Sequence, residues 1–351
     1  MSGTAAQRRA YTVVGGGAIG GTIAFHLAKA GHPVLVVDQD TEHVGAISDQ
    51  GLGIRRPDGR VERQPVRAIT PDGADALPAT GGGLGAVVLA VKAQATDPAV
   101  RWIAPRLAED GFVVSLQNGL CEEQIAAEVG ERRTVTAFVN LFADLVAPGL
   151  IADGGAGALV VGELDGRVSP RVERLVTDLR AWGPAVAHPN VAGHLWSKQS
   201  YSVVGATSAL VDVPIHETIE AHPDMTVALA REVYAVGAAI GVHPESFDHW
   251  EAGAFAVDAH LPYTRQVLAD FCGWLRTQPK NKTGIWRDLA VRKRPTEVPA
   301  MLAPVLRLAD DHGINCPGIR TVVRLIGELE RGERRMDESN VTEVERAVSG
   351  R

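Results

Sequence analysis

Residues 11–38 read YTVVGGGAIGGTIAFHLAKAGHPVLVVD, and this stretch decides the fold of the first half of the chain. A short apolar run, Tyr11–Val14, leads into a glycine-rich turn and then into a stretch with helical spacing that ends at Gly31. A second run rich in valine, Val34–Val37, closes on Asp38. Strand, glycine turn, helix and strand in this order predict a βαβ unit of the dinucleotide-binding type.

The spacing of the glycines assigns a physical task to each of them. Gly15, Gly17 and Gly20 form the pattern GxGxxG, which allows a tight turn, close approach of the backbone to a pyrophosphate, and close packing of helix on strand. The start of the following helix offers N–H groups and a positive dipole end to the phosphates. Glycine is common in this chain, with 38 residues, so a turn without a ligand is the alternative. Asp38 after the second strand favours the cofactor site.

Asp38 also indicates which cofactor binds. A carboxylate at this position can accept hydrogen bonds from both ribose hydroxyls, but it would repel the 2′-phosphate of NADP. The neighbouring Gln39 and Asp40 supply no arginine that could compensate. The sequence therefore predicts NAD, with NADP less favoured. The alternative is that Asp38 only caps the next turn.

Further strands follow in the first half. Buried parallel strands are nearly continuous in Val and Leu, and this pattern predicts strands in the runs 85–92, 111–119, 134–140 and 158–164. The segment GLIADGGAGA at 149–158 is rich in Gly and Ala and predicts a hairpin or a loop.

The character of the chain changes near Gly193. From there on, strand-like runs give way to helical patterns such as HLWSKQSYSVVGATSALV and EVPAMLAPVLRLADDHG. The sequence therefore predicts an α/β fold with an N-terminal Rossmann NAD(P)-binding domain over 1–190 and an all-helical substrate and catalytic domain over 191–351. The tail after Gly332, rich in Glu and Arg, is predicted to be a solvated helix end or disordered.

Composition narrows the classes of function. The formal net charge of −7 disfavours non-specific binding to nucleic acid or to anionic lipid. No apolar run is long enough to cross a bilayer, and the N-terminus does not have the pattern of a signal peptide. The histidines show no metal-ligand spacing, so no metal is predicted. The three cysteines contain no CxxC pair and fit a reducing compartment, which predicts a cytoplasmic protein; they are Cys121, Cys272 and Cys316.

Five motifs resemble those of the ketopantoate reductase (2-dehydropantoate 2-reductase) family. They are GGGAIGG at 15–21, LAVKAQ at 89–94, LQNG at 116–119, LWSK at 195–198 and WRDLAVRKRPTEV at 286–298. The resemblance covers about residues 11–330 and agrees with the two predicted domains. It implies an NAD(P)H-dependent oxidoreductase that transfers a hydride between the nicotinamide and a 2-keto acid or 2-hydroxy acid.

The resemblance also places the catalytic groups. The family's catalytic lysine falls on Lys198 and its partner glutamate on Glu297, and the asparagine of LQNG falls on Asn118. Hydride delivery to a carbonyl carbon leaves charge on the oxygen, so a positioned lysine can act as general acid and a carboxylate can hold it in register. Without the family, Lys198 would be a surface lysine and Glu297 a carboxylate at a helix start.

Cofactor contacts follow from the same resemblance. Lys92 and Asn118 end two predicted strands at their carboxyl edge, where ligands bind in open α/β sheets. A polar strand end and a turn-forming Asn-Gly pair are the alternatives. The full set of expected cofactor contacts is Gly15, Gly17, Ala18, Ile19, Gly20, Asp38, Lys92, Gln94 and Asn118.

Several positions depart from the family pattern. Ser202 and Ala206 stand where the family typically has asparagines, and Gly284 stands where it has a serine. Together with Trp286, these changes predict a differently shaped and more apolar pocket, suited to a branched or aromatic 2-keto acid or another carbonyl rather than to ketopantoate. Replacement hydroxyls are available at Tyr201, Thr207 and Ser208.

Two other functions stay open at this point. One is a 3-hydroxy acid or opine/imine-type dehydrogenase on the same scaffold. The LQNG motif and the Thr296-Glu297 segment favour the 2-keto acid reductase over it. The other is a dinucleotide-binding protein without turnover. The presence of both Lys198 and Glu297 argues against this function. The expected partner is a small carbonyl or hydroxy acid substrate, with no nucleic acid and no membrane. The amount of apolar helix in the second half predicts a homodimer.

Overall fold

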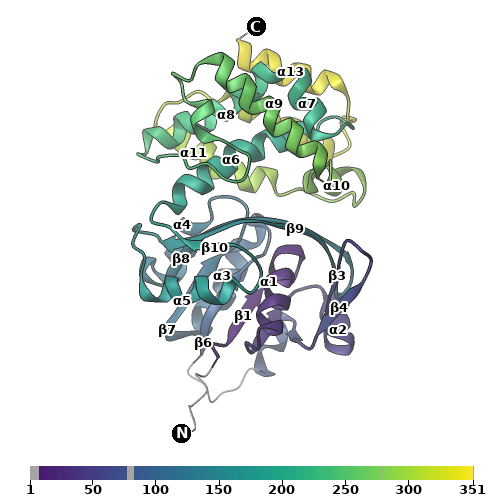
Figure 1. Cartoon of the computed structure of the whole chain (residues 1–351), viewed down its shortest axis with the longest axis vertical. Helices are drawn as coiled ribbons and strands as arrows, with labels where there is room; N and C mark the ends of the chain where they lie inside the picture. Colours follow the sequence, from purple (N-terminus) through teal and green to yellow (C-terminus); the bar gives the residue numbers. More distant parts are fainter. Residues whose placement is uncertain (1–7, 77–82, 279, 351) are drawn as a thin grey trace. The chain divides into compact units, whose positions relative to one another are not determined.

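The structure is a computed structural model of the chain that describes residues 8–76, 83–278 and 280–350. The chain divides into two compact units, Met1–Val191 and Ala192–Arg351 (Figure 1). Each unit has its own core and is described by itself.

The first unit is built around a mixed sheet. Within the described residues the sheet has ten strands in the order β4-β3-β9-β8-β7-β6-β1-β2-β5, with β10 paired to β9. The strands are β1 (Tyr11–Val14), β2 (Val34–Val37), β3 (Leu52–Arg55), β4 (Val61–Gln64), β5 (Arg67–Ile69), β6 (Leu84–Leu89), β7 (Leu107–Ser115), β8 (Thr134–Ala147), β9 (Leu150–Glu163) and β10 (Ala185–Ala187).

Strand β1 lies at the centre of the parallel part of this sheet. It pairs in parallel with β2 on one side and with β6 on the other, and all four of its residues are buried. Burial on both faces explains why the strand sequences are continuously apolar rather than alternating. The helices of this unit are α1 (Ala18–Lys29), α2 (Thr41–Gln50), α3 (Thr96–Ile103), α4 (Glu122–Val129) and α5 (Pro170–Leu179). The predicted Rossmann unit is confirmed.

Of the two alternatives for 149–158, the hairpin is present and the loop is not: only Gly149 belongs to the turn, and residues 150–158 are part of strand β9. Strands β8 and β9 are each 14 residues long and pair antiparallel, so the connection is only Pro148 and Gly149. Glycine occurs inside β9 because the chains approach closely there: a Cβ at Gly154 would lie 2.6 Å from the carbonyl oxygen of Phe142. Pairing with β8 and β3 on both sides overrides the low strand propensity of Gly and Ala.

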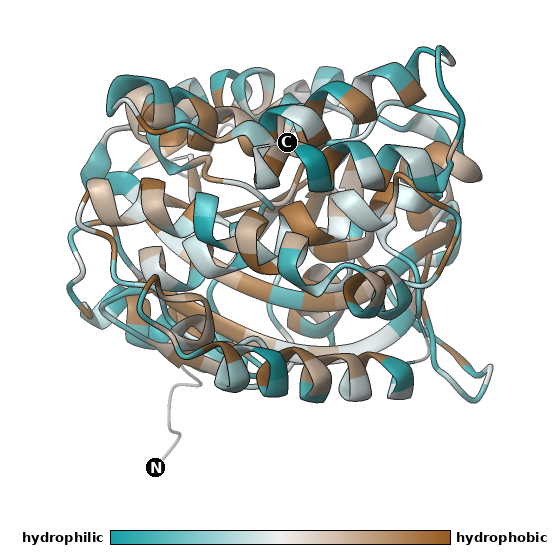
Figure 2. Ribbon diagram, turned by 90° about the horizontal axis from the view of Figure 1, so that it is seen from above, coloured by the Kyte–Doolittle hydropathy of each residue, from teal (hydrophilic) through white to brown (hydrophobic). Residues whose placement is uncertain are grey.

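The second unit is helical, as the sequence predicts. Its helices are α6 (Val191–Ser208), α7 (Ile215–Ala221), α8 (Pro223–Ala239), α9 (Leu261–Thr277), α10 (Gly284–Ala290), α11 (Val298–Asp311), α12 (Pro317–Glu330) and α13 (Glu338–Ser349). Figure 2 shows apolar and polar residues on the same helices, as expected for amphipathic helices that bury one face.

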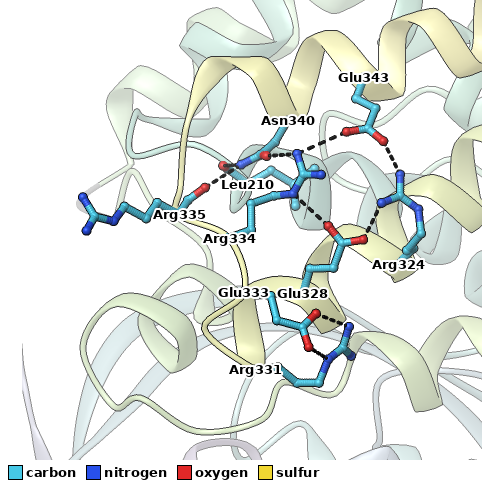
Figure 3. Close-up of polar contacts among 9 residues, drawn as sticks. All are labelled: Leu210, Arg324, Glu328, Arg331, Glu333, Arg334, Arg335, Asn340 and Glu343. Atoms are coloured by element: carbon cyan, nitrogen blue, oxygen red, sulfur yellow. Dashed lines mark hydrogen bonds and ion pairs between the residues drawn. The ribbon is translucent and has the colours of Figure 1, made fainter.

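The tail after Gly332 is predicted to be a solvated helix end or disordered. In the structure its residues 338–349 form the ordered helix α13. This helix buries Val341 and Val344, and its high content of Glu and Arg conceals that apolar face. Figure 3 shows how ion pairs join it to α12: Arg324 contacts Glu328 and Glu343, and Arg334 bonds both carboxylates.

Asn340 is the buried member of this junction. Its side-chain amide donates to the carbonyl oxygens of Leu210, at 2.9 Å, and Arg335, at 2.8 Å, and its oxygen accepts from Arg334 at 3.0 Å. Asn340→Ala removes all three of these hydrogen bonds, although the Leu210 carbonyl keeps the Asp337 N–H at 3.1 Å, so we expect a loss of about 2 kcal/mol in the free energy of unfolding. Urea titration followed by far-UV circular dichroism measures this, with exposed Ser339→Ala as the control. Identical midpoints for the two variants would contradict it.

Candidate active site

The glycine turn after β1 has the shape that a dinucleotide requires. Gly15 has a φ of +95°, and a Cβ there would lie 2.7 Å from the backbone nitrogen of Val91. A Cβ at Gly20 would lie 2.0 Å from the Gly15 oxygen, so α1 can approach β1 only with glycine at this position. A Cβ at Gly17 would instead meet no atom within 4 Å. Gly15 and Gly20 serve the packing of the protein, and Gly17 leaves space for a ligand beside the N-terminus of α1.

Asp38 follows β2 and points back to this turn. One of its carboxylate oxygens accepts from the Gly16 N–H at 2.7 Å and the other from the Asp40 N–H at 3.0 Å. The N-cap of α2 is Asp40, which accepts from the His43 N–H at 3.0 Å, so Asp38 is not the helix cap. Each oxygen of Asp38 keeps a further lone pair that a ribose hydroxyl could use. The turn and Asp38 together fit a nicotinamide dinucleotide.

The surroundings of Asp38 are acidic. Strand β5 pairs in parallel with β2, and the Asp38 N–H donates to the Ile69 oxygen, so the segment after β5 lies at the same edge. That segment contributes Asp72, in addition to Asp40 after β2, and residues 38–43 and 70–73 contain no Lys or Arg. The sequence does not predict this neighbour, because a three-residue strand such as β5 carries too little pattern.

Lys92 and Asn118 lie after neighbouring strands. Lys92 follows β6 and caps the short 3-10 helix Ala93–Ala95, which includes the exposed Gln94, and Asn118 follows β7. Since β1, β6 and β7 are parallel and adjacent, the residues that follow them share one edge of the sheet. Gln117, which the motifs did not single out, braces this edge by donating to the Val91 oxygen at 3.0 Å and to the Thr96 hydroxyl at 2.9 Å.

Glu122 is a partly buried acid close to this edge in sequence. It begins α4 four residues after Asn118, and its carboxylate accepts from the Thr136 hydroxyl at 3.3 Å. Burial raises the pKa of Glu122 to about 7, against hydrogen bonds that lower it. Sequence reasoning missed this residue, since a Glu at a helix start is ordinary.

In the second unit, Lys198 lies on α6 with an altered acidity. Burial lowers the pKa of the Lys198 ammonium to about 8, and the carboxylates of Glu297 and Asp248 oppose this shift. Glu297 is the N-cap residue of α11, but its side chain makes no capping hydrogen bond. The helix-cap interpretation of Glu297 therefore lacks support, whereas its electrostatic interaction with Lys198 is present.

Asp248 is the second carboxylate, and the sequence contains no signal for it. It lies in a tight turn in which Phe247 and Trp250 exchange backbone hydrogen bonds of 3.1 and 2.8 Å. Its φ of +44° is in the left-handed region, which Asp tolerates better than most residues. The Trp250 indole donates to the Ser200 hydroxyl of α6 at 3.0 Å, which ties the turn to the helix that carries Lys198.

Tyr201 lies one helical turn after Lys198 and packs in an aromatic cluster. Its ring centroid lies 5.6 Å from that of Trp250 and 5.7 Å from that of Phe271. Burial raises the pKa of the Tyr201 phenol to about 12. The other two replacement hydroxyls are bonded to their own helix: Thr207 donates to Val203, and Ser208 donates to Gly205, each at 2.8 Å.

Trp286 has polar partners. Its indole donates to Asp212 at 2.9 Å, and the Lys282 ammonium lies 4.1 Å from its ring centroid. Among the described residues no group of three or more His, Cys, Asp or Glu side chains could hold a metal ion. No helix in the described ranges is long and apolar enough to span a membrane.

A Rossmann-type unit with this turn, followed by a helical unit with a partly buried lysine, is typical of a class of dinucleotide-dependent oxidoreductases. Family models assign the chain within that class: residues 11–166 match ketopantoate reductase PanE/ApbA, and residues 190–330 match its C-terminal domain. The chain therefore belongs to the ketopantoate reductase family and is an oxidoreductase.

Individual relatives agree with this assignment. A 2-dehydropantoate 2-reductase of Mesorhizobium japonicum is 29% identical, with 92% of this chain and 98% of the relative covered. The enzyme of that name from Halobacterium salinarum is also 29% identical, covering 91% and 98%. Among solved structures, a PanE/ApbA family ketopantoate reductase from Ralstonia eutropha has a TM-score of 0.75 at 25% identity, covering 92% and 99%. A D-mandelate dehydrogenase solved with NADH and anilino(oxo)acetate shares the fold, with a TM-score of 0.76 at 19% identity and the same coverage.

Proposed function

We propose that this protein is an NADH-dependent reductase of a 2-keto acid, with Lys198 as the general acid. The observation that carries the proposal is the partly buried Lys198, whose pKa is lowered to about 8 by burial against the opposing influence of the Glu297 and Asp248 carboxylates. A general acid works best when its pKa is close to the working pH. The bound nicotinamide supplies the hydride that reduces the carbonyl carbon.

The residues of the chain then have separate roles. Lys198 holds a proton on Nζ and donates it to the carbonyl oxygen as negative charge develops there. Glu297 favours the protonated form of Lys198 and holds it in position. In the first unit, Gly17 and the start of α1 would bind the pyrophosphate, and Lys92, Gln94 and Asn118 would lie beside the nicotinamide half. We accordingly propose a cofactor domain over 1–190 and a catalytic domain over 191–351.

NAD is the cofactor that the described site favours. Asp38 contacts the glycine turn, Asp40 and Asp72 lie in the segments that follow β2 and β5 at the same edge of the sheet, and these two segments contain no basic residue to pair with a 2′-phosphate. Like charges in such a site disfavour binding by electrostatic repulsion. The NADH in the D-mandelate dehydrogenase structure agrees with this choice. NADPH remains the second candidate.

For the substrate, we propose a 2-keto acid with a branched or aromatic side chain. Ala206 is fully buried, so the position where the family typically has an asparagine is occupied by packing rather than by an amide. Ser202 and Gly284 remove two further polar groups, and Tyr201 adds an aromatic ring on the helix of Lys198. Fewer hydrogen-bonding groups and more aromatic surface favour an apolar side chain over the hydroxylated one of ketopantoate.

A panel of 2-keto acids tests the proposed function. Purified protein is mixed with NADH or NADPH and with ketopantoate, branched or aromatic 2-keto acids, 3-keto acids and an imine-forming pair of keto acid and amine. We expect the largest kcat/KM for a branched or aromatic 2-keto acid with NADH. Turnover of 3-keto acids or imines alone would replace the proposal with the 3-hydroxy acid or opine class. Tight NADH binding without any turnover would favour a non-catalytic dinucleotide-binding protein.

We also propose a cytoplasmic homodimer that associates through the helical unit. Several large apolar side chains are exposed on that unit, among them Val257 at 86%, Val291 at 64% and Leu261 at 54%. The described cysteines are buried free thiols, which fits a reducing compartment. Light scattering at micromolar concentration should give twice the chain mass, and a monomer mass would reject the dimer.

The charge of Asp248 should set the basic limb of the pH profile. Lys198 must be protonated to donate, so reduction is lost as pH rises through its pKa near 8. Asp248→Asn removes a carboxylate that raises this pKa but keeps a residue that tolerates the left-handed turn. We expect kcat to begin its decline at lower pH in Asp248→Asn, with little change at pH 6.5.

The matched control for this experiment is Asp258→Asn, which removes an exposed carboxylate that is not one of the two charges shifting the pKa of Lys198. Its pH profile should coincide with that of the wild type. A basic limb that stays in place in Asp248→Asn would show that Asp248 does not influence the proton donor.

A further inference from the structure

His43 is a buried histidine that belongs to none of the motifs. It lies in the first turn of α2 and is only 1% exposed. Its Nε2 lies 2.8 Å from the carbonyl oxygen of Gly16, and its Nδ1 accepts from the Gly149 N–H at 2.9 Å. A backbone N–H can only donate, so Nδ1 carries no proton, and the ring donates from Nε2 to Gly16.

The Gly16 residue is therefore held from two sides. Its N–H donates to Asp38 at 2.7 Å, and its carbonyl accepts from His43. In a trans peptide the C=O and the following N–H point in opposite directions. With the Gly16 carbonyl fixed on His43, the Gly17 N–H must point away from His43. No described residue accepts that N–H, and a Cβ at Gly17 would meet open space.

The other partner of His43 is a rigid part of the sheet. Gly149 is at the tip of the β8–β9 hairpin, and its carbonyl accepts from the Gly53 N–H of β3 at 2.8 Å. Its φ of +69° and the 3.0 Å that would separate a Cβ from Ala46 leave room only for glycine. Through its two ring nitrogens, His43 thus connects the glycine turn after β1 to the tip of the β8–β9 hairpin.

We propose that His43 is a positioning residue for the pyrophosphate: it orients the Gly16–Gly17 peptide so that the Gly17 N–H faces the phosphate oxygens. This inference rests on the proposed dinucleotide function. A preorganised donor binds an anion more tightly than one that must first be oriented, because binding then includes no cost of ordering. An imidazole that served only to fill the core would have no such effect on ligand affinity.

Two substitutions at this position separate the two hydrogen bonds. The amide nitrogen of Gln in His43→Gln can replace Nε2 and donate to the Gly16 carbonyl. The amide oxygen of Asn in His43→Asn can replace Nδ1 and accept from Gly149, but leaves the Gly16 carbonyl without its donor. Each variant loses one buried hydrogen bond, so the two melting temperatures should fall by similar amounts.

Binding of NADH and of ADP-ribose, which contains the pyrophosphate without the nicotinamide, is measured by calorimetry for the wild type and both variants. We expect Kd for both ligands to rise about tenfold in His43→Asn and less than about threefold in His43→Gln, with kcat at saturating NADH unchanged. Equal Kd values in the two variants would overturn the inference and leave the proposed function intact. A wild-type protein that binds neither NADH, NADPH nor ADP-ribose would overturn both.

Discussion

Lys198→Ala lowers kcat for 2-keto acid reduction by about 10²- to 10⁴-fold, the range that a positioned general acid contributes. The reason is that the neighbouring hydroxyls are poor substitutes for the proton on Nζ: Thr207 and Ser208 bond to helix carbonyls, and the phenol of Tyr201 has a pKa raised to about 12. The Kd of NADH should not change, because the glycine turn and Asp38 lie in the other unit.

Stopped-flow oxidation of NADH under saturating keto acid measures this loss, and the melting temperature shows whether the variant is folded. Added methylamine provides the control, since a small ammonium ion can take the place of the missing group. We expect it to restore part of the rate in Lys198→Ala and to leave the wild type unchanged. A variant with more than a third of the wild-type kcat would remove Lys198 from the mechanism.

Asp38→Asn changes the cofactor preference by about 10- to 100-fold toward NADPH, which corresponds to removing one like charge near a phosphate in a partly solvated site. The variant keeps an oxygen that can accept from the Gly16 N–H, so the glycine turn should retain its shape. It loses the charge that repels a 2′-phosphate. The NADH affinity should fall moderately, because an amide accepts hydrogen bonds from ribose hydroxyls more weakly than a carboxylate.

The ratio of kcat/KM for NADH and NADPH measures the preference directly. Asp49→Asn is the matched control, as it removes the same charge from the exposed last turn of α2. Its ratio should equal that of the wild type. If Asp38→Asn kept the wild-type ratio, or if the wild type already preferred NADPH, the acidic environment of Asp38 would not determine cofactor choice.

The parts of the fold that the sequence predicts are those with strong local patterns. The βαβ unit combines a buried strand, a GxGxxG turn and a terminal Asp38, and each of these is recognisable within a few residues. The predictions that failed concern elements whose local sequence pattern is weak. The strand β9 is rich in Gly and Ala and is stabilised by pairing with β8 and with β3, the second of which is about 100 residues away in the sequence. Helix α13 has only a few apolar residues, among them the buried Val341 and Val344, between many charged ones, so its helical pattern is weak.

The candidate site shows the same division. Lys198 and Glu297 are found through motif resemblance, but the burial that lowers the pKa of Lys198 depends on the folded unit. Asp248 and His43 have no motif at all. Asp248 interacts with Lys198 because a turn 50 residues later is bonded to α6, and His43 contacts a glycine 106 residues away. Contacts of this kind depend on tertiary structure, which a single sequence does not display.

If this protein reduces 2-keto acids, the hydride of the nicotinamide must arrive at C2 of the product. This is tested by incubating the enzyme with NADH that carries deuterium at both C4 positions of the nicotinamide and with the best 2-keto acid, and by locating the label by NMR. We predict deuterium at C2 of a single enantiomer of the 2-hydroxy acid, and loss of this product in Lys198→Ala. Unlabelled product, label at C3 or on an amine-bearing carbon, or no product from any 2-keto acid would contradict the account.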